Sequence, residues 1–431
     1  MKLLLENIGM LKHAELSLHP LCVIAGENDN GKSTIGKIVF CIVKAINKYQ
    51  DQLQESKEHQ LSEKVEEIYF YLRNNAKDSP SQIIDSLRQL RYFSRRNINI
   101  ADALPTLDTT IRDIFERVHF EPEVHAKTRV LRQEIQALIN EPENVTQSIE
   151  NAFTKVFASE FDSSLLLQGA TEGRIQLVEN NLKLIDLAVT KDGVKLVTDV
   201  EPIILKDATF IDTPLILNNH DILARSQTLF DIDQRRPNML GQPFTTLHTK
   251  DLFDKLRQPT LPHDLFDYEK MILSKEIHDI INGEISYDRG DRDFVFQRKG
   301  ESVSIKNTAS GIKVFGLLDI LINNDFVTKN TILIFDEPEN HLHPKWQLKL
   351  AEILFKLVEN GIYVLVSSHS PYLIEALARA AERKETDIKA RFSLAEKNTI
   401  SDKNRLSDIF STLSEPFEVF RKMDEEVLRD E

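Results

Sequence analysis

Along the first part of the chain, hydrophobic and polar residues alternate, and the spacing then changes to that of a helix. Val, Ile and Leu alternate with Glu, His and Ser before residue 25, which is typical of half-buried strands. Three strands are expected here, Lys2–Ile8, Ala14–Leu18 and Leu21–Ala25. Apolar residues then recur at helical spacing from Gly31 to about Lys48, which predicts a helix directly after the third strand.

The next stretch, from about residue 50 to residue 160, contains no glycine and is rich in charged residues. Apolar stripes at helical spacing occur in four places, 61–72, 83–93, 111–118 and 130–138. Prolines punctuate this stretch, at Pro80, Pro105, Pro122 and Pro142. The pattern predicts several packed helices with breaks between them, forming an inserted lobe over residues 51–165.

Alternation with a period of two returns in residues 166–300. Strands separated by hairpin signals are expected at 175–177, 182–189 and 194–197, and a further strand at 209–217. Residues 218–262 lack clear periodicity and contain four prolines, which predicts a long connector. A helix from Asp264 to about Ile281 and short strands near 284–288, 292–298 and 302–306 complete this part.

Residues 301–431 combine a small-residue turn with fully apolar runs. The turn, Asn307 to Lys313, leads into a helix, Val314–Leu321. Two buried strands are expected after it, Thr331–Phe335 and Ile362–Val366. Together with the N-terminal elements, they predict an α/β fold with a mixed sheet, flanking helices and an antiparallel β part. The expected domains are 1–50, 51–165, 166–300 and 301–431, of which the second is a mainly helical insertion.

Composition limits the class of protein. The 431 residues are 41% hydrophobic and 28% charged, an ordinary soluble composition. No apolar run approaches the roughly 18 residues of a membrane span, and the N-terminus lacks the architecture of a signal peptide. We expect Cys22 and Cys41 to be reduced core residues of a cytoplasmic protein. The net charge of −14 argues against coating nucleic acid through bulk charge, and it leaves room for a local basic groove.

A glycine-bounded loop connects the third strand to the helix, and it reads Gly-Glu-Asn-Asp-Asn-Gly-Lys-Ser-Thr from Gly26 to Thr34. Strand, loop and helix in this order are the context that the phosphate-loop pattern G-x-x-x-x-G-K-[ST] requires. Backbone N–H groups and the positive end of the helix suit an anion, while Lys32 reaches β/γ-phosphates and the Ser33 hydroxyl ligates Mg²⁺. The residues expected to bind ATP and Mg²⁺ are Gly26, Asn28, Asn30, Gly31, Lys32, Ser33 and Thr34. The alternative is a glycine-rich turn that merely caps the helix.

Two later strands end in polar residues. Asp336 and Glu337 follow the strand at 331–335, and His369 comes after the strand at 362–366. Ligands bind at the carboxyl ends of strands in α/β sheets. Asp336 therefore suits the Mg²⁺ shell, and Glu337 suits the polarisation of an attacking water. His369 is expected within reach of a γ-phosphate, and the alternative is a structural histidine at a strand end.

Taken in order, these motifs resemble the heads of ABC-type P-loop ATPases, with a large insertion as in the SMC and DNA-repair branch. The text Phe335–Pro344 together with Ser368–Leu373 is similar to the overcoming-lysogenization-defect (OLD) type ATPases. It is also similar to the ATPase subunits of bacterial anti-phage systems such as PtuA of Septu. The match covers roughly residues 1–45 and 300–380.

The resemblance implies that two heads enclose ATP, so that the chain forms at least a homodimer. Lys32, Glu337 and His369 would then be catalytic, with Glu337 as the base and His369 as the switch histidine. Ser310 and Gly311 align with the signature serine and first glycine, which face the phosphate loop of the other copy.

Several positions depart from the family pattern. Ile312 and Lys313 stand where the signature has its second glycine and its glutamine, which bears on activation across the dimer. His343 stands where many heads carry an aspartate. For the glutamine of the Q-loop, Gln50 and Gln52 are candidates.

OLD-type nucleases carry a Toprim domain after such a head, whereas only 62 residues follow His369 here. The resemblance therefore implies an ATPase that senses and regulates a separate nuclease subunit, of the HNH or Toprim type, in anti-phage defence. An alternative is a DNA-repair or chromosome-associated ATPase that acts on DNA through its insertion. A metabolic P-loop kinase would need neither the signature turn nor His369.

The insertion also carries arginines on one expected helix face, Arg88, Arg91 and Arg95, beside Tyr92 and Arg96. One interpretation is a contact with nucleic acid or with a partner protein. The other is a solvated basic face that the many nearby acidic residues offset. The sequence leaves both open.

Overall fold

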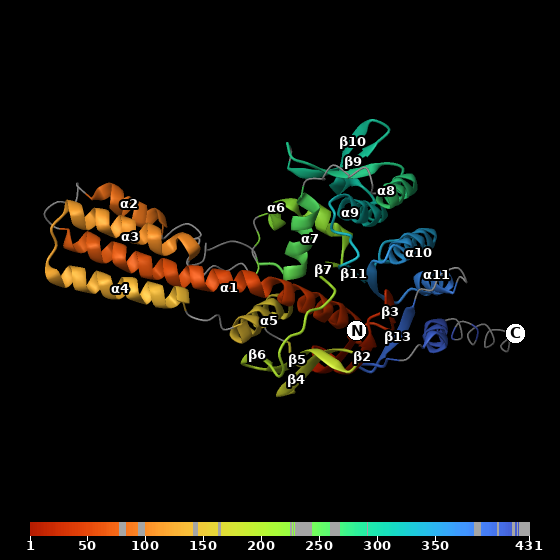
Figure 1. Cartoon of the computed structure of the whole chain (residues 1–431). Coiled ribbons are helices and arrows are strands. Elements are labelled where there is room, and N and C mark those ends of the chain that lie inside the picture. Colours follow the sequence, from red (N-terminus) through yellow and green to blue (C-terminus); the bar gives the residue numbers. More distant parts are fainter. Residues whose placement is uncertain are drawn as a thin grey trace. The chain divides into compact units, whose positions relative to one another are not determined.

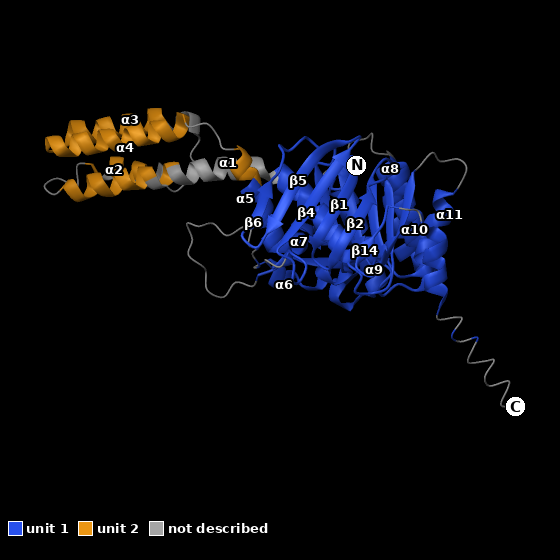
Figure 2. Cartoon of the chain, turned by 90° about the horizontal axis from the view of Figure 1, so that it is seen from below, with its two compact units in different colours: residues 1–47, 150–431 blue, residues 48–149 orange. Residues whose placement is uncertain are grey.

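The structure is a computed structural model, and it describes residues 1–76, 83–93, 100–140, 145–162, 165–224, 226, 228, 244–258, 268–290, 292–382, 389–402, 405–415, 419 and 421. The chain forms two compact units, which have different colours in Figure 2. Unit 1 consists of Met1–Asn47 and Glu150–Glu431, and unit 2 consists of Lys48–Ile149.

A mixed sheet is the centre of unit 1 (Figure 1). Within the described residues it has eleven strands in the order β6-β5-β4-β1-β2-β14-β13-β3-β12-β11-β7. Their bounds are β1 Lys2–Ile8, β2 Leu11–Ser17, β3 Leu21–Ala25, β4 Glu172–Glu179, β5 Leu182–Thr190, β6 Gly193–Leu196, β7 Asp207–Ile211, β11 Thr331–Asp336, β12 Tyr363–Ser368, β13 Ala390–Glu396 and β14 Thr399–Ile400. The first and last thirds of the chain therefore share one sheet.

The strand that precedes the phosphate loop, β3, lies in the parallel part of the sheet. It pairs in parallel with β12 and β13, and β12, β11 and β7 continue the parallel order. Ala25 lies opposite Ser368, and Asp336 lies opposite Ser367. Because the strands are parallel, the carboxyl ends of β3, β12 and β11 meet at one edge of the sheet. All five residues of β3 are buried, which accounts for its continuous apolar sequence.

The antiparallel part of the sheet consists of β6, β5, β4, β1 and β2. Asn180 and Asn181, which connect β4 to β5, have φ angles of 48° and 67°. Two consecutive left-handed residues are typical of the tight hairpin turn that the sequence predicts here. The antiparallel β part of the predicted fold is thus confirmed.

Helices and a small second sheet complete unit 1. The helices are α5 Val145–Phe161, α6 His220–Leu223, α7 Leu247–Arg257, α8 Tyr268–Ile281, α9 Ser310–Asn323, α10 Pro344–Glu359 and α11 Pro371–Ala381, with 3-10 turns at Pro214–Asn218 and Ile305–Asn307. The second sheet has the order β10-β9-β8, with β8 Glu284–Asp288, β9 Asp293–Arg298 and β10 Glu301–Ser304. Apolar residues of α6 to α11 and of the parallel strands form one continuous core. Cys22 and Cys41 are buried free thiols.

Unit 2 is helical and has a core of its own. It contains the later part of α1 (Lys32–Asn75), followed by α2 (Ile84–Phe93), α3 (Ile100–Arg117) and α4 (Pro122–Asn140). Residues of the predicted apolar stripes are buried together, among them Leu61, Ile68, Leu90, Ile114 and Leu131. The predicted α/β class with a mainly helical insertion is therefore confirmed.

Among the described helices, none combines the length and apolar character that crossing a bilayer needs.

Two boundaries of the first helical region differ from the prediction. The helix expected to end near Lys48 continues to Asn75, because no glycine or proline interrupts the sequence before Pro80. At the other end, the structure groups residues from Glu150 onward with unit 1. The reason is that α5 binds the edge of the main sheet: the Leu196 N–H donates to Glu150 at 2.9 Å, and the Val194 N–H donates to the Thr154 hydroxyl at 3.2 Å.

Three expectations about local structure were wrong. The strand expected at 209–217 ends at Ile211, because Pro214 begins a 3-10 turn that the Thr213 hydroxyl caps. The connector expected at 218–262 contains α6 and α7. Pro105 lies inside α3 and does not separate two helices. Residues 225, 227, 229–243 and 259–262 of that connector lie outside the described residues.

Buried charges join α1, β7 and α7 in unit 1. Lys44 donates to Asp207 at 2.5 Å and to Asp251 at 2.6 Å. Lys255 lies 2.6 Å from the other oxygen of Asp207 and 3.0 Å from that of Asp251. Two ammonium groups and two carboxylates thus alternate, so that each of the two buried ammonium groups has two opposite neighbours. This cluster fixes α7 against the strand that borders β11.

Candidate functional site

The loop from Gly26 to Gly31 turns tightly between β3 and α1. Gly26 has a φ angle of 148° and Gly31 one of 80°, conformations that favour glycine. A Cβ on Gly26 would lie 2.4 Å from the Ala395 carbonyl oxygen, and one on Gly31 would lie 2.6 Å from Leu11. Both predicted glycines are therefore required by backbone angle and by space. The loop ends at the N-terminus of α1, where unpaired N–H groups suit an anion.

Lys32 crosses the loop and reaches the end of the neighbouring acidic strand. Its ammonium donates to the Glu27 carbonyl at 2.8 Å and lies 3.7 Å from Glu337 Oε1. The side chain is only 4% exposed. The structure thus brings a buried cation to the edge where β3 and β11 end.

Ser33 and Asp336 meet at the same edge. The Ser33 hydroxyl donates to Asp336 Oδ1 at 3.0 Å, and the Ser367 hydroxyl donates to the same oxygen. A hydroxyl and a carboxylate are hard oxygen donors of the kind that Mg²⁺ prefers. Among the described residues, no group of three or more His, Cys, Asp and Glu side chains could hold a metal by itself. Ser33 and Asp336 thus supply two oxygen donors that would suit such an ion.

Glu337 has an unusual backbone conformation. Its φ angle is 50°, in the left-handed region that is rare for a residue other than glycine. Its N–H donates to the Ser367 carbonyl at 2.9 Å, which ties this conformation to β12. Glu337 Oε1 lies 3.4 Å from His369 Nδ1, and Oε2 accepts from the Asn340 amide at 3.2 Å. Such strain is often found at functional sites, and here it directs the carboxylate toward both Lys32 and His369.

The other residues predicted to bind ATP, Asn28, Asn30 and Thr34, differ in how far they are exposed. Asn28 is exposed, whereas the Asn30 side chain contacts the backbone of Glu27 and Asn398. Thr34 is buried, and a Cβ on Gly9 would lie 2.8 Å from its methyl group. Asn28 is thus the predicted residue that lies most open to a ligand, while Thr34 packs inside the unit.

The signature residues lie at the start of α9. Ser310 is the first residue of that helix, and a Cβ on Gly311 would lie 3.0 Å from the Trp346 ring. Within the described residues, no hydrogen bond or ion pair joins Ser310 or Gly311 to the phosphate loop. Lys313, which replaces the signature glutamine, is buried, and its ammonium donates to Asn218 at 2.9 Å. Burial lowers the pKa of Lys313.

Several other positions from the sequence analysis have a structural explanation or lie outside the described part. His343 caps the N-terminus of α10 by accepting the Lys345 N–H at 3.3 Å. The exposed Arg88 pairs with Asp85 at 3.3 Å on the same helix. The side chains of Gln50, Gln52, Arg91 and Tyr92, and the whole of Arg95 and Arg96, lie outside the described residues.

Two groups near the site were not predicted. The first is Glu339, a buried carboxylate that accepts hydrogen bonds from the segment around His369. In the sequence, Glu339 is part of the motif Phe335–Pro344, and the sequence analysis gives it no role. The second is a set of charges around His248. Asp212 follows Ile211, which lies opposite Phe335, so that Asp212 and Asp336 end neighbouring strands.

His248 joins Asp212 to the interior of unit 1. His248 Nδ1 lies 2.6 Å from Glu160 Oε1, and Nε2 lies 3.3 Å from Asp212 Oδ2. Lys37 of α1 pairs with Glu160 at 3.3 Å. Burial by itself lowers the pKa of His248, but the hydrogen bonds with Asp212 and Glu160 outweigh it and raise the pKa to about 9. His248 is therefore charged at neutral pH and donates a hydrogen bond to each carboxylate.

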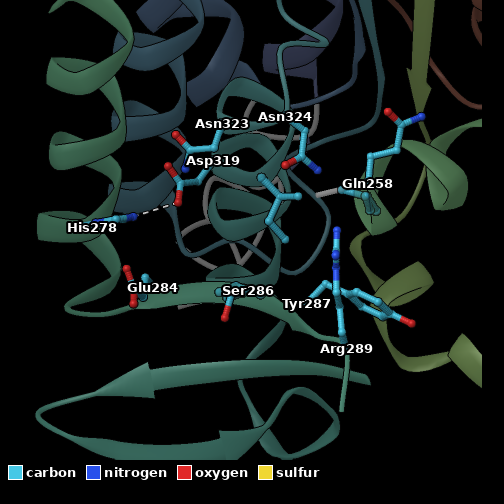
Figure 3. A pocket seen from close by; sticks show the side chains of 12 residues that line it. Gln258, His278, Glu284, Ser286, Tyr287, Arg289, Asp319, Asn323 and Asn324 are labelled. Atoms are coloured by element: carbon cyan, nitrogen blue, oxygen red, sulfur yellow. Dashed lines mark hydrogen bonds and ion pairs between the residues drawn. The ribbon is translucent and has the colours of Figure 1, made fainter. Parts of the chain in front are cut away.

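A separate cavity of about 470 Å³ lies among α8, α9 and β8 (Figure 3). In its wall His278 and Asp319 form an ion pair of 2.8 Å, drawn as a dashed line in Figure 3. The hydrogen bond with Asp319 raises the pKa of His278. None of the site residues predicted from the sequence lines this cavity, which is therefore distinct from the phosphate-loop site.

Comparison with known families gives a match to one part of the chain. Residues 235–375 match the family described as "AAA domain, putative AbiEii toxin, Type IV TA system". The matched segment contains Ser310, Asp336, Glu337 and His369, and the phosphate loop lies outside it. This part of the chain is thus similar to an AAA domain. No curated protein sequence matches the chain significantly.

Solved structures give distant similarities to the chain as a whole. The SMC head domain from Thermotoga maritima is 10% identical, with 93% of this chain and 96% of that chain covered and a TM-score of 0.36. The ADP conformation of an ATP-binding cassette of an ABC transporter is 12% identical, with 98% and 99% covered and a TM-score of 0.34. An Smc head domain with an extended coiled coil from Pyrococcus furiosus, bound to the C-terminal domain of ScpA, is 10% identical, with 99% and 98% covered and a TM-score of 0.31.

Proposed function

We propose that this protein binds and hydrolyses ATP with Mg²⁺ and thereby regulates a separate nuclease in bacterial anti-phage defence. The observation that carries the ATPase part is the meeting of Lys32, the Ser33–Asp336 pair and the Glu337–His369 pair at one sheet edge. A cation, a hydroxyl–carboxylate pair and a carboxylate–imidazole pair are the groups that phosphoryl transfer to water uses.

Each residue at this edge has a distinct role in the proposal. The backbone of Gly26 to Gly31 and the ammonium of Lys32 bind the phosphates. Ser33 and Asp336 hold Mg²⁺, which when bound offsets the negative charge of the phosphates. Glu337 accepts the proton of the attacking water, and His369 contacts the terminal phosphate.

The signature residues are assigned to a second copy of the chain. In this proposal Ser310 and Gly311, at the start of α9, face the phosphate loop of the second copy. The protein therefore acts as at least a homodimer. Because Lys313 is buried against Asn218, the contribution across the dimer comes from Ser310 and Gly311 rather than from Lys313.

The proposed regulatory role rests on the sequence motifs around Asp336 and His369. Those motifs are similar to those of ATPase subunits of anti-phage systems, and the matching family is described as a putative AbiEii toxin of a type IV toxin–antitoxin system. In this proposal the described residues provide the nucleotide-dependent element, and a nuclease of the HNH or Toprim type is a separate subunit. Any contact with nucleic acid is made by that partner or by unit 2.

Lys32→Ala is expected to lower the affinity for ATP about tenfold or more. The substitution removes a charge-assisted contact with phosphate, which is worth roughly 1.5–3 kcal/mol. Isothermal titration calorimetry measures the effect. Lys349→Ala, which removes a half-exposed ammonium of α10, is the matched control and should bind ATP normally. Unchanged affinity in the Lys32 variant would refute the phosphate-loop assignment.

Purification of the native complex tests the regulatory role. We expect a small HNH or Toprim nuclease to co-purify, with its retention or activity changing when ATP and Mg²⁺ replace nucleotide-free buffer. Light scattering on the same sample should give at least a dimer of the ATPase chain. A repair exonuclease as the partner would favour a DNA-repair function, and a strict monomer in both states would contradict the shared site.

A further inference from the structure

Glu339 lies two residues after Glu337 and is almost completely buried, with 3% of its side chain exposed. One of its oxygens, Oε1, accepts three hydrogen bonds from consecutive residues. The donors are the Ser368 hydroxyl at 2.7 Å, the His369 N–H at 2.8 Å and the Ser370 N–H at 3.1 Å. The carboxylate therefore fixes the backbone that connects β12 to α11, where His369 lies.

A second contact ties the same two segments together. The Ser370 hydroxyl donates to the Gln347 side chain at 2.5 Å, and that side chain donates to the Leu342 carbonyl at 3.1 Å. The segment after β11 and the segment after β12 are thus joined at two places. The backbone at His369 cannot move away from the segment after β11 without breaking these buried hydrogen bonds, and a buried polar group left unpaired is costly.

Backbone donors alone do not account for a charged side chain at this position, because an uncharged oxygen could accept the same N–H groups. A buried carboxylate carries a desolvation cost that needs an opposite charge or strong donors to offset it. Glu339 Oε2 is buried without a hydrogen-bond partner among the described residues. The ionisable group beside this carboxylate is the His369 ring, whose Nδ1 lies 3.5 Å from Glu339 Oε1.

His369 Nδ1 thus faces two carboxylates, since Glu337 Oε1 lies 3.4 Å away as well. This atom is buried and has no hydrogen-bond partner among the described residues, so the two carboxylates act on it through their charge, while the side chain as a whole is 41% exposed. Two negative charges at Nδ1 favour a hydrogen on that nitrogen. The opposite nitrogen, Nε2, is then the one left for a ligand on the exposed side of the ring.

We propose that Glu339 is a positioning residue whose charge holds His369 Nδ1–H, so that His369 Nε2 meets the terminal phosphate of ATP. The assignment rests on the proposed ATPase function. Glu337 touches the reacting water, whereas Glu339 acts only through His369. The motif Asp-Glu-Pro-Glu therefore contains two glutamates with different tasks, one for the water and one for the histidine.

A double-mutant cycle tests this role. Glu339→Gln keeps an oxygen for the backbone donors but removes the charge, and His369→Ala removes the ring. We expect each single variant to lower kcat about tenfold, with the affinity for ADP unchanged. The double variant should be no slower than His369→Ala alone, because Glu339 has no other route to the reaction. Losses that multiply in the double variant would overturn the proposal.

A binding measurement separates this proposal from the ATPase assignment itself. The ratio of ATP to ADP affinity, measured by calorimetry, should fall about fivefold in Glu339→Gln and in His369→Ala, and no further in the double variant. A wild-type protein that binds neither nucleotide would refute the proposed function. Normal nucleotide binding with an unchanged ratio in Glu339→Gln would refute the positioning role alone.

Two further variants test whether the effect of Glu339→Gln is specific or comes from a loss of folding. Ser368→Ala removes one of the three donors to Glu339 and should shift the ATP/ADP ratio in the same direction by a smaller factor. Glu352→Gln removes a carboxylate on the exposed face of α10 and should leave kcat and both affinities unchanged. An effect of Glu352→Gln equal to that of Glu339→Gln would show that any lost negative charge acts alike, and would overturn the proposal.

Discussion

Glu337→Gln is expected to bind ATP with Mg²⁺ normally and to hydrolyse it about 10²–10⁴ times more slowly. Glutamine keeps the shape of the side chain but cannot accept the proton of the attacking water. It can also keep the hydrogen bond from Asn340, and the backbone N–H of residue 337 still donates to Ser367. Phosphate release under single-turnover conditions measures the rate, and calorimetry measures binding.

The matched control for this variant is Glu375→Gln on α11. Glu375 pairs with Arg379 on the surface of the same helix, outside the phosphate-loop edge. Its substitution should leave turnover unchanged. If Glu337→Gln also turns over at the wild-type rate, the base of the reaction is another group.

The stability of unit 1 is expected to decrease by about 3 kcal/mol between pH 6.5 and pH 9 because of His248. In the folded protein the pKa of His248 is about 9, above the ordinary value of 6.5. The folded state therefore binds this proton more tightly than the unfolded state. The resulting stability is fully present below pH 6.5 and is lost as the pH rises through 9.

Urea unfolding at a series of pH values measures this effect, with fluorescence of Trp346 as the signal. Trp346 is the single tryptophan of the chain and packs against Phe315 inside unit 1. His248→Gln keeps a polar side chain without the charge and should remove most of the difference between pH 6.5 and 9. His341→Gln, at an exposed histidine, should keep the wild-type dependence. Equal pH dependence in wild type and His248→Gln would contradict the assignment.

The sequence predicts those parts of the site in which function depends on local order. Gly26 to Ser33 form a loop between two neighbouring elements, and Asp336 directly follows its own apolar strand. Because parallel strands place their carboxyl ends at one edge, the strand pattern alone indicates that these residues and His369 lie close together. The structure places Lys32 beside Glu337, and Glu337 beside His369, as that reasoning expects.

Groups whose partners are distant in the sequence were not predicted. Glu160 and His248 are 88 positions apart, and His248 and Asp212 are 36 apart, so that no spacing rule connects them. Glu339 stands among other polar residues, and only the approach of β12 gives it three donors. The helix α7 was not predicted because its apolar face is short, consisting of Leu252, Phe253 and Leu256, and because prolines flank it in the sequence. Tertiary contacts decide all of these.

The order of strands in the main sheet also has a consequence for synthesis of the protein. β3 is made early, but both strands that pair with it, β12 and β13, come from residues 363–368 and 390–396. Pairing across so long a sequence separation is intrinsically slow, and it cannot begin before these later residues have left the ribosome. Unit 2, by contrast, is one uninterrupted segment with its own core and can complete its contacts earlier. Unit 2 can therefore fold while the loop that follows β3 still lacks both supporting strands, and that loop takes up its final conformation only after residues 363–396 have been made.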